Sequence, residues 1–171
     1  VDNGMPVVVL RASDFGLTGA ESPADLEANE ELKKRIERIR LQIGPKMNLG
    51  DVEKKTVPKM TLISPPQSGG VVNTRSFIPH RVHEAIGVLG AVSVATACML
   101  PGSVADGIAK ASPGAGEQRL EIEHPTGFFT VDMDVVVNNG DVSIRRSALL
   151  RTARKLMRGE VYIPSKVWDR K

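Results

Sequence analysis

The feature that most constrains this chain is an apolar stretch near its middle. Ala85 to Leu100 is a run of sixteen residues without a formal charge, and it ends at Pro101-Gly102. A helix that is apolar on nearly every face belongs in a protein core or in a membrane. We therefore predict a central helix over about residues 81–100. Small or hydroxyl-bearing residues keep one flank of this helix narrow, namely Gly87, Gly90, Ser93 and Thr96.

Composition favours a protein core over a membrane. The run is slightly shorter than the roughly 20 residues that a membrane-spanning helix requires. Across 171 residues the chain is 41% hydrophobic and 25% charged, which is ordinary for a soluble globular domain. The first residues lack the basic and apolar regions of a secretory signal, and one cysteine, Cys98, is typical of a reducing compartment. We expect a cytoplasmic protein that has no membrane partner.

Short apolar and alternating segments on both sides of the central run predict β-strands. The first segment begins at Val7, which suggests that more of the chain precedes it. A short basic helix is predicted at 151–158 and a last strand at 160–163. Together these elements predict an α+β fold, in which a curved, mostly antiparallel sheet is wrapped around the central helix. The predicted strands before residue 151 are 7–10, 60–64, 71–78 (antiparallel to 60–64), 119–123, 128–137 and 142–150, with a hairpin turn at 138–141.

A second helix is predicted over about residues 23–43. Ser22-Pro23-Ala24-Asp25 is a typical helix start, with a Ser cap, Pro at the first position and an acid at the third. Gly44-Pro45 marks its end. We expect its Lys, Arg and Glu residues to face solvent. Its apolar positions, Leu32, Ile36, Ile39 and Ile43, form one amphipathic face.

A polar segment with two histidines precedes the central helix. His80 and His83 lie three residues apart, and Glu84 is the carboxylate beside them, which is a poor ligand set for a metal ion. A helix N-terminus attracts anions, so His80, Arg81 and backbone N–H groups could bind a carboxylate there. In the alternative interpretation, both histidines merely cap or decorate the helix end.

Three other features have two interpretations each. Asn3-Gly4-Met5-Pro6 precedes the first strand and is either a simple turn or a backbone approach to a ligand. Cys98 is interpreted as an inert buried residue more readily than as a nucleophile. The net charge is +3, and the basic residues of 145–158 are interpreted as a solvated face more readily than as a nucleic-acid surface. We expect no nucleic-acid partner.

Taken together, several motifs resemble one known family. The chain resembles the C-terminal half of the PrpF-like family, whose members adopt the diaminopimelate-epimerase-like fold. The predicted helix after Gly19, which starts with acidic residues and continues with basic ones, belongs to the match. The other matching segments are VDNGMPVVVLRA (1–12), VPKMTLISPP (57–66), PHRVHEAIGVLGAVSVATA (79–97), IEHPTG (122–127) and RTARKLMRGEVYIP (151–164).

The resemblance implies a two-domain enzyme in which two similar domains face each other across a cleft. Residues 1–171 would form a single domain similar to the C-terminal one, and the N-terminal domain would be absent. The family comprises cofactor-independent isomerases and tautomerases of unsaturated di- and tricarboxylates, such as aconitate, methylaconitate, methylitaconate and 4-oxalomesaconate. We therefore expect no cofactor and no metal, and a small unsaturated carboxylate as the substrate.

The resemblance also implies roles for individual residues. The main base is expected in the missing half, with His80 or Ser76 as a proton donor from this half. Cys98 lies too far along the helix to match the cysteine pair of the epimerases.

The alternative function is a non-catalytic domain that binds carboxylates or associates with itself as a homodimer. The residues expected to contact substrate are Asn3, Gly4, Met5, Ser76, His80, Arg81 and His83.

Overall fold

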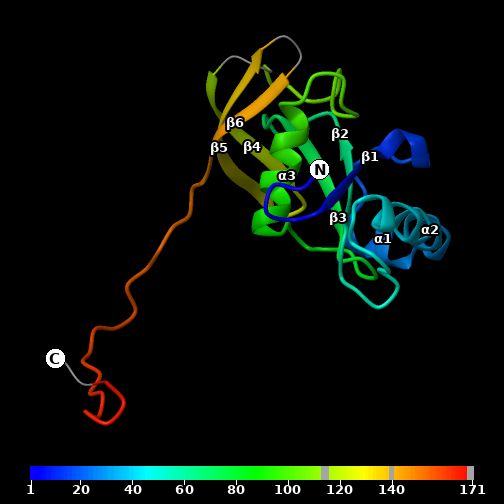
Figure 1. Ribbon diagram of the computed structural model, residues 1–171. Coiled ribbons are helices and arrows are strands. Elements are labelled where there is room, and N and C mark those ends of the chain that lie inside the picture. Colours follow the sequence, from blue (N-terminus) through cyan, green and yellow to red (C-terminus); the bar gives the residue numbers. More distant parts are fainter. Residues whose placement is uncertain (113–115, 139–140, 169–171) are drawn as a thin grey trace.

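The computed structural model describes residues 1–112, 116–138 and 141–168. Figure 1 shows a curved sheet with one helix inside it, two helices beside it and a C-terminal segment that extends away from this body. The elements are β1 (Val7–Arg11), a 3₁₀ helix (Ala12–Phe15), α1 (Pro23–Ala28), α2 (Glu30–Lys46), β2 (Lys59–Ser64), β3 (Val72–Phe77), α3 (Val88–Cys98), β4 (Gly116–His124), β5 (Gly127–Asn138) and β6 (Asp141–Leu149).

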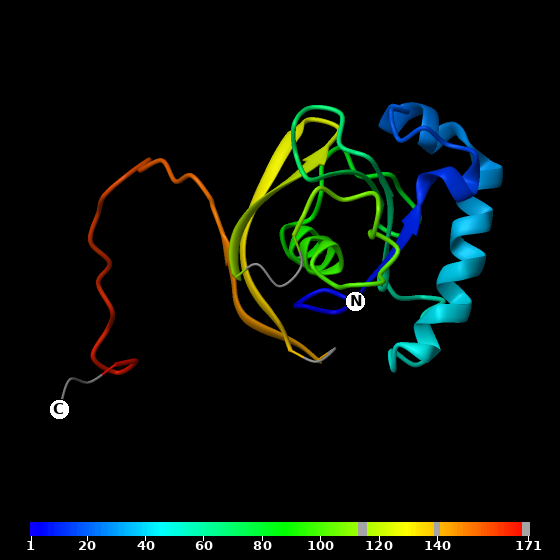
Figure 2. The ribbon, with the colours of Figure 1, turned by 90° about the horizontal axis from the view of Figure 1, so that it is seen from above.

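The six strands form one sheet in the order of the sequence. Neighbours are antiparallel in β2–β3, β4–β5 and β5–β6, and parallel in β1–β2 and β3–β4. Seen from above, the sheet curls around α3 (Figure 2). This arrangement confirms the predicted α+β fold, including the antiparallel pairing of the strands at 60–64 and 71–78.

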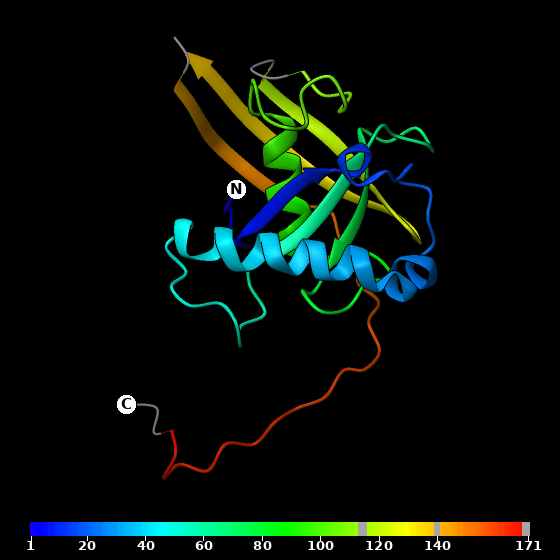
Figure 3. The same cartoon turned by 90° about the vertical axis from the view of Figure 1, so that its right-hand side faces the viewer.

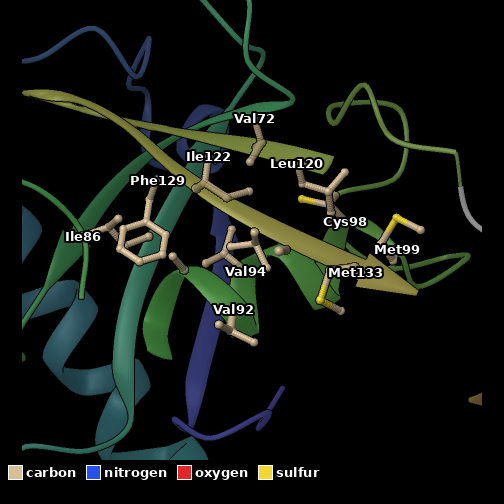
Figure 4. Close-up of a cluster of buried hydrophobic side chains, with 14 of the residues drawn as sticks. Val72, Ile86, Val92, Val94, Cys98, Met99, Leu120, Ile122, Phe129 and Met133 are labelled. Atoms are coloured by element: carbon tan, nitrogen blue, oxygen red, sulfur yellow. The ribbon is translucent and has the colours of Figure 1, made fainter. Parts of the chain in front are cut away.

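The core lies between α3 and the concave face of the sheet. Every residue of α3 from Gly90 to Cys98 is buried. Figure 4 shows Val94 and Cys98 of α3 among side chains of β3, β4 and β5. No helix in the described part of the chain has the length and hydropathy to cross a bilayer. The apolar run is therefore explained by enclosure within the sheet, as predicted. Its partners in the sheet are Val7, Ile63, Val72, Leu120, Ile122, Phe129, Val131, Met133 and Val135.

Helices α1 and α2 cover the opposite, convex face of β1–β3, and α2 runs across these strands (Figure 3). Leu26, Leu32 and Ile36 pack there against Met60, Leu62 and Phe77 of the sheet. The predicted helix at 23–43 is divided in two at Asn29, whose side-chain oxygen accepts a hydrogen bond from Leu32 N–H at 3.0 Å and so caps a new helix. The capping box at Ser22 and Asp25 forms as expected.

Helix α3 is shorter than the predicted range of about 81–100, because the residues before Val88 use their backbone groups elsewhere. Val82 forms an antiparallel bridge with Phe77. Ile78 N–H donates to the Arg81 carbonyl at 2.7 Å, and His83 N–H donates to the Ser76 carbonyl at 2.8 Å. These bonds close a tight turn after β3, so the histidine segment is a loop and not the first turns of the helix.

The C-terminal predictions were wrong for the chain as it stands. Residues 151–158 form no helix and 160–163 form no strand, and the segment from 151 to 168 runs away from the body (Figures 1 and 2). Leu156, Met157, Val161 and Tyr162 are more than 80% exposed. These apolar side chains meet no surface here on which a helix or a strand could pack. The middle of the predicted hairpin turn, residues 139–140, lies outside the described residues, although β5 and β6 pair on either side of it.

Arg40 departs from the expectation that the charged face of the second helix meets solvent. Its side chain is completely buried under the connection that follows α2. The guanidinium pairs with the Glu37 carboxylate at 2.7 Å. It also donates at 2.8 Å to the carbonyl oxygens of Val52 and Val57. One buried arginine thereby satisfies backbone groups of a connection that has no strand or helix of its own.

We predict that Arg40→Met lowers the free energy of unfolding by about 3 kcal/mol, because it leaves buried carbonyl oxygens without donors. Urea denaturation followed by circular dichroism measures this change. The matched control is Arg38→Met, which removes an exposed arginine from the same helix and is expected to change stability by less than about 0.5 kcal/mol. Equal stability of the two variants would contradict the role given to Arg40.

Candidate functional site

A cavity of about 300 Å³ opens where α3 begins. Its walls come from the N-terminal segment, from β2 and β3, from the loop after β3 and from the first turn of α3. A largely apolar cavity with a few convergent polar groups is the usual form of a small-molecule site. The lining residues are Met5, Lys59, Thr61, Ser76, Phe77, Ile78, His83, Ile86, Gly87, Val88, Leu89 and Gly90.

The first turn of α3 contributes backbone N–H groups to this cavity. Gly87 caps the helix with extended backbone angles and supplies no side-chain hydrogen bond. The first hydrogen bond of the helix runs from Ala91 N–H to the Gly87 carbonyl at 2.8 Å. The N–H groups of Val88, Leu89 and Gly90 come before that bond, so the helix itself gives them no acceptor. Together with the helix dipole, they favour an anionic group in the cavity.

Two hydroxyl groups face this helix end from the sheet. Thr61 of β2 and Ser76 of β3 are directly paired, and their side-chain oxygens lie 3.0 Å apart in a hydrogen bond. Both residues are buried. A hydroxyl can donate and accept at the same time, so the pair can still offer one hydrogen bond to a ligand. The structure thus places Ser76, a predicted site residue, in the cavity.

Lys59 is a cation on the same wall, and the sequence analysis did not identify it. Because strand residues alternate between faces, Lys59 shares the α3-facing side of β2 with Thr61 and with the core residue Ile63. Burial lowers the pKa of Lys59, and the positive charge of Arg40 lowers it further. A lysine in register with the inward-facing positions of a predicted strand was the signal that could have revealed it.

His83 lies in the cavity with a defined orientation. Its Nδ1 accepts a hydrogen bond from Ala85 N–H at 2.9 Å. In the neutral ring the proton is therefore assigned to Nε2, which makes that nitrogen a donor. Of the two histidines that the sequence analysis singled out, His83 lines the cavity.

The loop that carries His83 is attached to the body at both ends. Val82 N–H donates to the Glu27 carboxylate of α1 at 2.7 Å, and this bond is the main reason that the pKa of Glu27 is lowered. Thr126, in the turn between β4 and β5, donates from its hydroxyl to the Glu84 carbonyl at 3.2 Å. The IEHPTG motif thereby helps to hold the loop that carries His83.

The remaining predicted residues divide into two groups. His80 and Arg81 are exposed and do not line the cavity, and His80 Nδ1 lies 3.9 Å from the Glu37 carboxylate. They point outward because the turn after β3 replaces the expected helix start. Met5 lines the cavity, whereas Gly4 packs beside Leu89 with a φ of +94° that favours glycine.

Asn3 makes internal contacts. Its side-chain amide donates to Thr96 Oγ1 at 2.9 Å and to Ser147 Oγ at 3.0 Å, so both amide hydrogens are used within the protein. The expected contact of Asn3 with a substrate therefore stays a prediction that rests on its remaining oxygen. Within the described residues, no group of three or more His, Cys, Asp or Glu side chains is arranged to hold a metal ion.

Comparison with known proteins identifies the family of this chain. The profile of the family described as PrpF protein matches residues 1–164. The chain belongs to the PrpF family. It is 56% identical to the 4-oxalomesaconate tautomerase of Pseudomonas putida over 98% of this chain and 45% of that protein. It is 26% identical to the 2-methyl-aconitate isomerase of Shewanella oneidensis over 96% of this chain and 45% of that protein.

A solved structure confirms the PrpF-type fold. The crystal structure of methylitaconate-delta-isomerase aligns with 92% of this chain and 44% of that chain, with a TM-score of 0.73 and 22% sequence identity. This PrpF-family chain therefore spans a little under half the length of the relatives that it matches. The family resemblance and the fold class inferred from the sequence are both confirmed.

The single cysteine of this PrpF-family chain lies in the core and not in the cavity. Cys98 is 5% exposed at the end of α3, and burial raises the pKa of its thiol to about 12. A thiol with so high a pKa holds almost no thiolate at neutral pH and is a poor nucleophile. The assignment of Cys98 to packing follows from this position.

We predict that the folded chain reacts with a thiol-specific disulfide reagent at pH 8 at least about a hundredfold more slowly than the same chain in 8 M urea, because the native thiol is both covered and protonated. Stopped-flow absorbance measures both rates. Rapid labelling of the folded chain would show that Cys98 is accessible and would contradict its place in the core.

Proposed function

We propose that this chain forms one domain of an enzyme that moves a proton, and with it a double bond, within an unsaturated di- or tricarboxylate. One observation supports this above all others: the open N–H groups of α3, Ser76 and His83 converge on one cavity. Such a site suits a carboxylate and offers groups that can donate a proton. The names of the relatives, which refer to 4-oxalomesaconate and 2-methylaconitate, support the substrate class.

The proposed reaction needs only proton transfer. A base removes a proton from a carbon next to a carboxylate or carbonyl group, and the negative charge moves onto oxygen. N–H groups at the start of α3 stabilise that enolate-like charge. A proton then returns at the allylic carbon, so one proton leaves, one is added, and no electrons are exchanged. We propose that the base lies outside this chain, and that Ser76 or His83 donates rather than His80.

The proposed domain organisation follows the length of the relatives. This chain aligns with about 45% of each, so we propose that a second domain completes the cavity. The exposed apolar side chains of residues 150–168 support this proposal, because they need a surface to cover them. We also propose that the enzyme acts in the cytoplasm, since the one cysteine of this chain is free and buried.

The second candidate is a non-catalytic domain that binds carboxylates or pairs with itself. The same apolar C-terminal segment favours it, because two copies could cover each other's exposed side chains. Light scattering after size exclusion separates the two proposals. A stable dimer that binds a tricarboxylate, and that gives no conversion even after it is joined to the remaining half, would favour the second candidate.

We predict that the 171-residue chain alone does not convert 4-oxalomesaconate or 2-methylaconitate, and that activity appears when it is joined to the remaining half of the enzyme.

Within the joined protein, His83→Gln is expected to lower kcat about a hundredfold, because a proton donor is removed. Ultraviolet absorbance of the conjugated substrate measures turnover.

The matched control is His80→Gln, which makes the same change at an exposed position outside the cavity and is expected to leave kcat unchanged. Full activity of the 171-residue chain would overturn the two-domain proposal. Loss of activity in His80→Gln, with His83→Gln unaffected, would reverse the assignment of the donor.

We predict that the C-terminal segment becomes covered when the two halves are joined. Trp168 is the single tryptophan, is 58% exposed and lies in this segment, so its emission is expected to shift to shorter wavelength. Replacing Leu156 and Tyr162 by Asp should weaken association of separately produced halves at least about tenfold. The control is Val104→Asp, at an exposed apolar residue outside the segment. Equal weakening by the control would contradict a role for the segment.

A further inference from the structure

Lys59 occupies a partly buried position on the α3-facing side of the sheet, where, within the described part of the chain, it is the one charged side chain that lines the cavity apart from His83. It faces α3 from the first residue of β2, directly beside Val7 of β1 in the sheet register. Val7 is completely buried in the core, and Ile63, on the same face of β2, is 1% exposed. Placing a cation on this face reduces its hydration, which is unfavourable unless an anion compensates. The position therefore requires an explanation beyond packing.

The protein supplies no anion to Lys59 among the residues that the structure describes. Acidic partners lie instead beside other cations, such as Lys33, Arg40 and Arg119. No Asp or Glu is among the residues that line the cavity. The Lys59 ammonium donates to the Thr56 carbonyl, and this bond occupies one of its three N–H donors. Among the described residues the other two donors meet no acceptor, so solvent or a ligand can take them.

We propose that Lys59 is the counter-ion of one carboxylate group of the ligand in this cavity. The inference rests on the proposed function for the class of ligand, and it adds a residue that determines specificity. Lys59 lies on the sheet wall of the cavity, whereas the open N–H groups of α3 lie on the helix wall. Apolar side chains such as Ile86 and Leu89 line the space with them. Two anion-binding walls and an apolar lining favour a short hydrocarbon that carries at least two carboxylates over a monocarboxylate.

Binding to the 171-residue chain tests this directly. The probe is propane-1,2,3-tricarboxylate, a saturated compound that cannot isomerise, with butanoate as the monocarboxylate comparison. Calorimetry is expected to show saturable tricarboxylate binding that Lys59→Met weakens at least about tenfold, since the variant loses a partly desolvated charge pair. Lys59→Arg keeps the charge, so its affinity for the tricarboxylate is expected to lie between that of the unchanged chain and that of Lys59→Met. The matched control, Lys54→Met, removes an exposed lysine five residues earlier and should bind like the unchanged chain.

Kinetics of the joined two-domain protein give an independent measurement. A contact made equally with substrate and transition state raises KM and leaves kcat nearly unchanged, so Lys59→Met should raise KM at least about tenfold. If the joined protein is active and Lys59→Met keeps the original KM, this inference fails while the proposed function stands. If no isomerase activity is found but tricarboxylate binding still depends on Lys59, the proposed function fails and the inference stands.

Stability separates a binding role from a structural one. Lys59→Met removes a charge from a partly buried position, so the urea midpoint of the variant should equal or exceed that of the unchanged chain. A clearly lower midpoint, together with unchanged tricarboxylate affinity, would make Lys59 structural and overturn the proposal. Absence of saturable tricarboxylate binding by both the 171-residue chain and the joined protein would overturn it as well.

Discussion

The enclosure of α3 is the constraint on which the rest of this structure depends. A helix without charged residues that is buried from Gly90 to Cys98 must be covered on nearly every side, and a flat sheet covers only one. The sheet therefore curves around it, with β1–β3 on one flank and β4–β6 on the other (Figure 2). The first turn of the helix is the part that this enclosure leaves open, and its N–H groups reach the cavity there. The location of the candidate site is thus a consequence of how the core is packed.

The few polar groups of α3 serve this packing as well. Ser93 donates from its hydroxyl to the Met5 carbonyl at 2.6 Å, and Thr96 accepts a hydrogen bond from the Asn3 amide. Both contacts tie the N-terminal segment to the helix and hold Met5 at the cavity wall. Because buried hydroxyl groups need partners, the narrow polar flank of an apolar helix fixes where the segment before β1 runs. Asn3 therefore positions the site whether or not its free oxygen contacts a ligand.

Periodicity in the sequence was enough to predict the central helix, the helix that begins at Ser22 and the strands up to residue 150, since each depends on local alternation and caps. It did not predict how polar residues would be partnered, because partners come from distant parts of the chain. Arg40 is charged and was expected in solvent, yet its acceptors belong to a connection more than ten residues later. The segment from Arg81 to His83 was expected to begin the helix, but hydrogen bonds back to β3 took its backbone groups. The family resemblance came from motifs that follow one another in the expected order along the chain, so it did not depend on how the polar residues are partnered.

Two features of the cavity leave polar groups of the protein available to a ligand, and this makes their coincidence informative. Gly87 leaves the helix without a side-chain cap, although Ser or Asp there would satisfy an N–H group. Lys59 presents a cation on a face whose neighbouring side chains, such as Val7, Thr61 and Ile63, are uncharged. Polar groups that the protein leaves available in this way are expected at functional sites. The same kind of group would partner both features, because a carboxylate can accept hydrogen bonds from the helix N–H groups and neutralise the Lys59 ammonium. A cap and an ion pair supplied by the protein would have filled the space that the ligand needs.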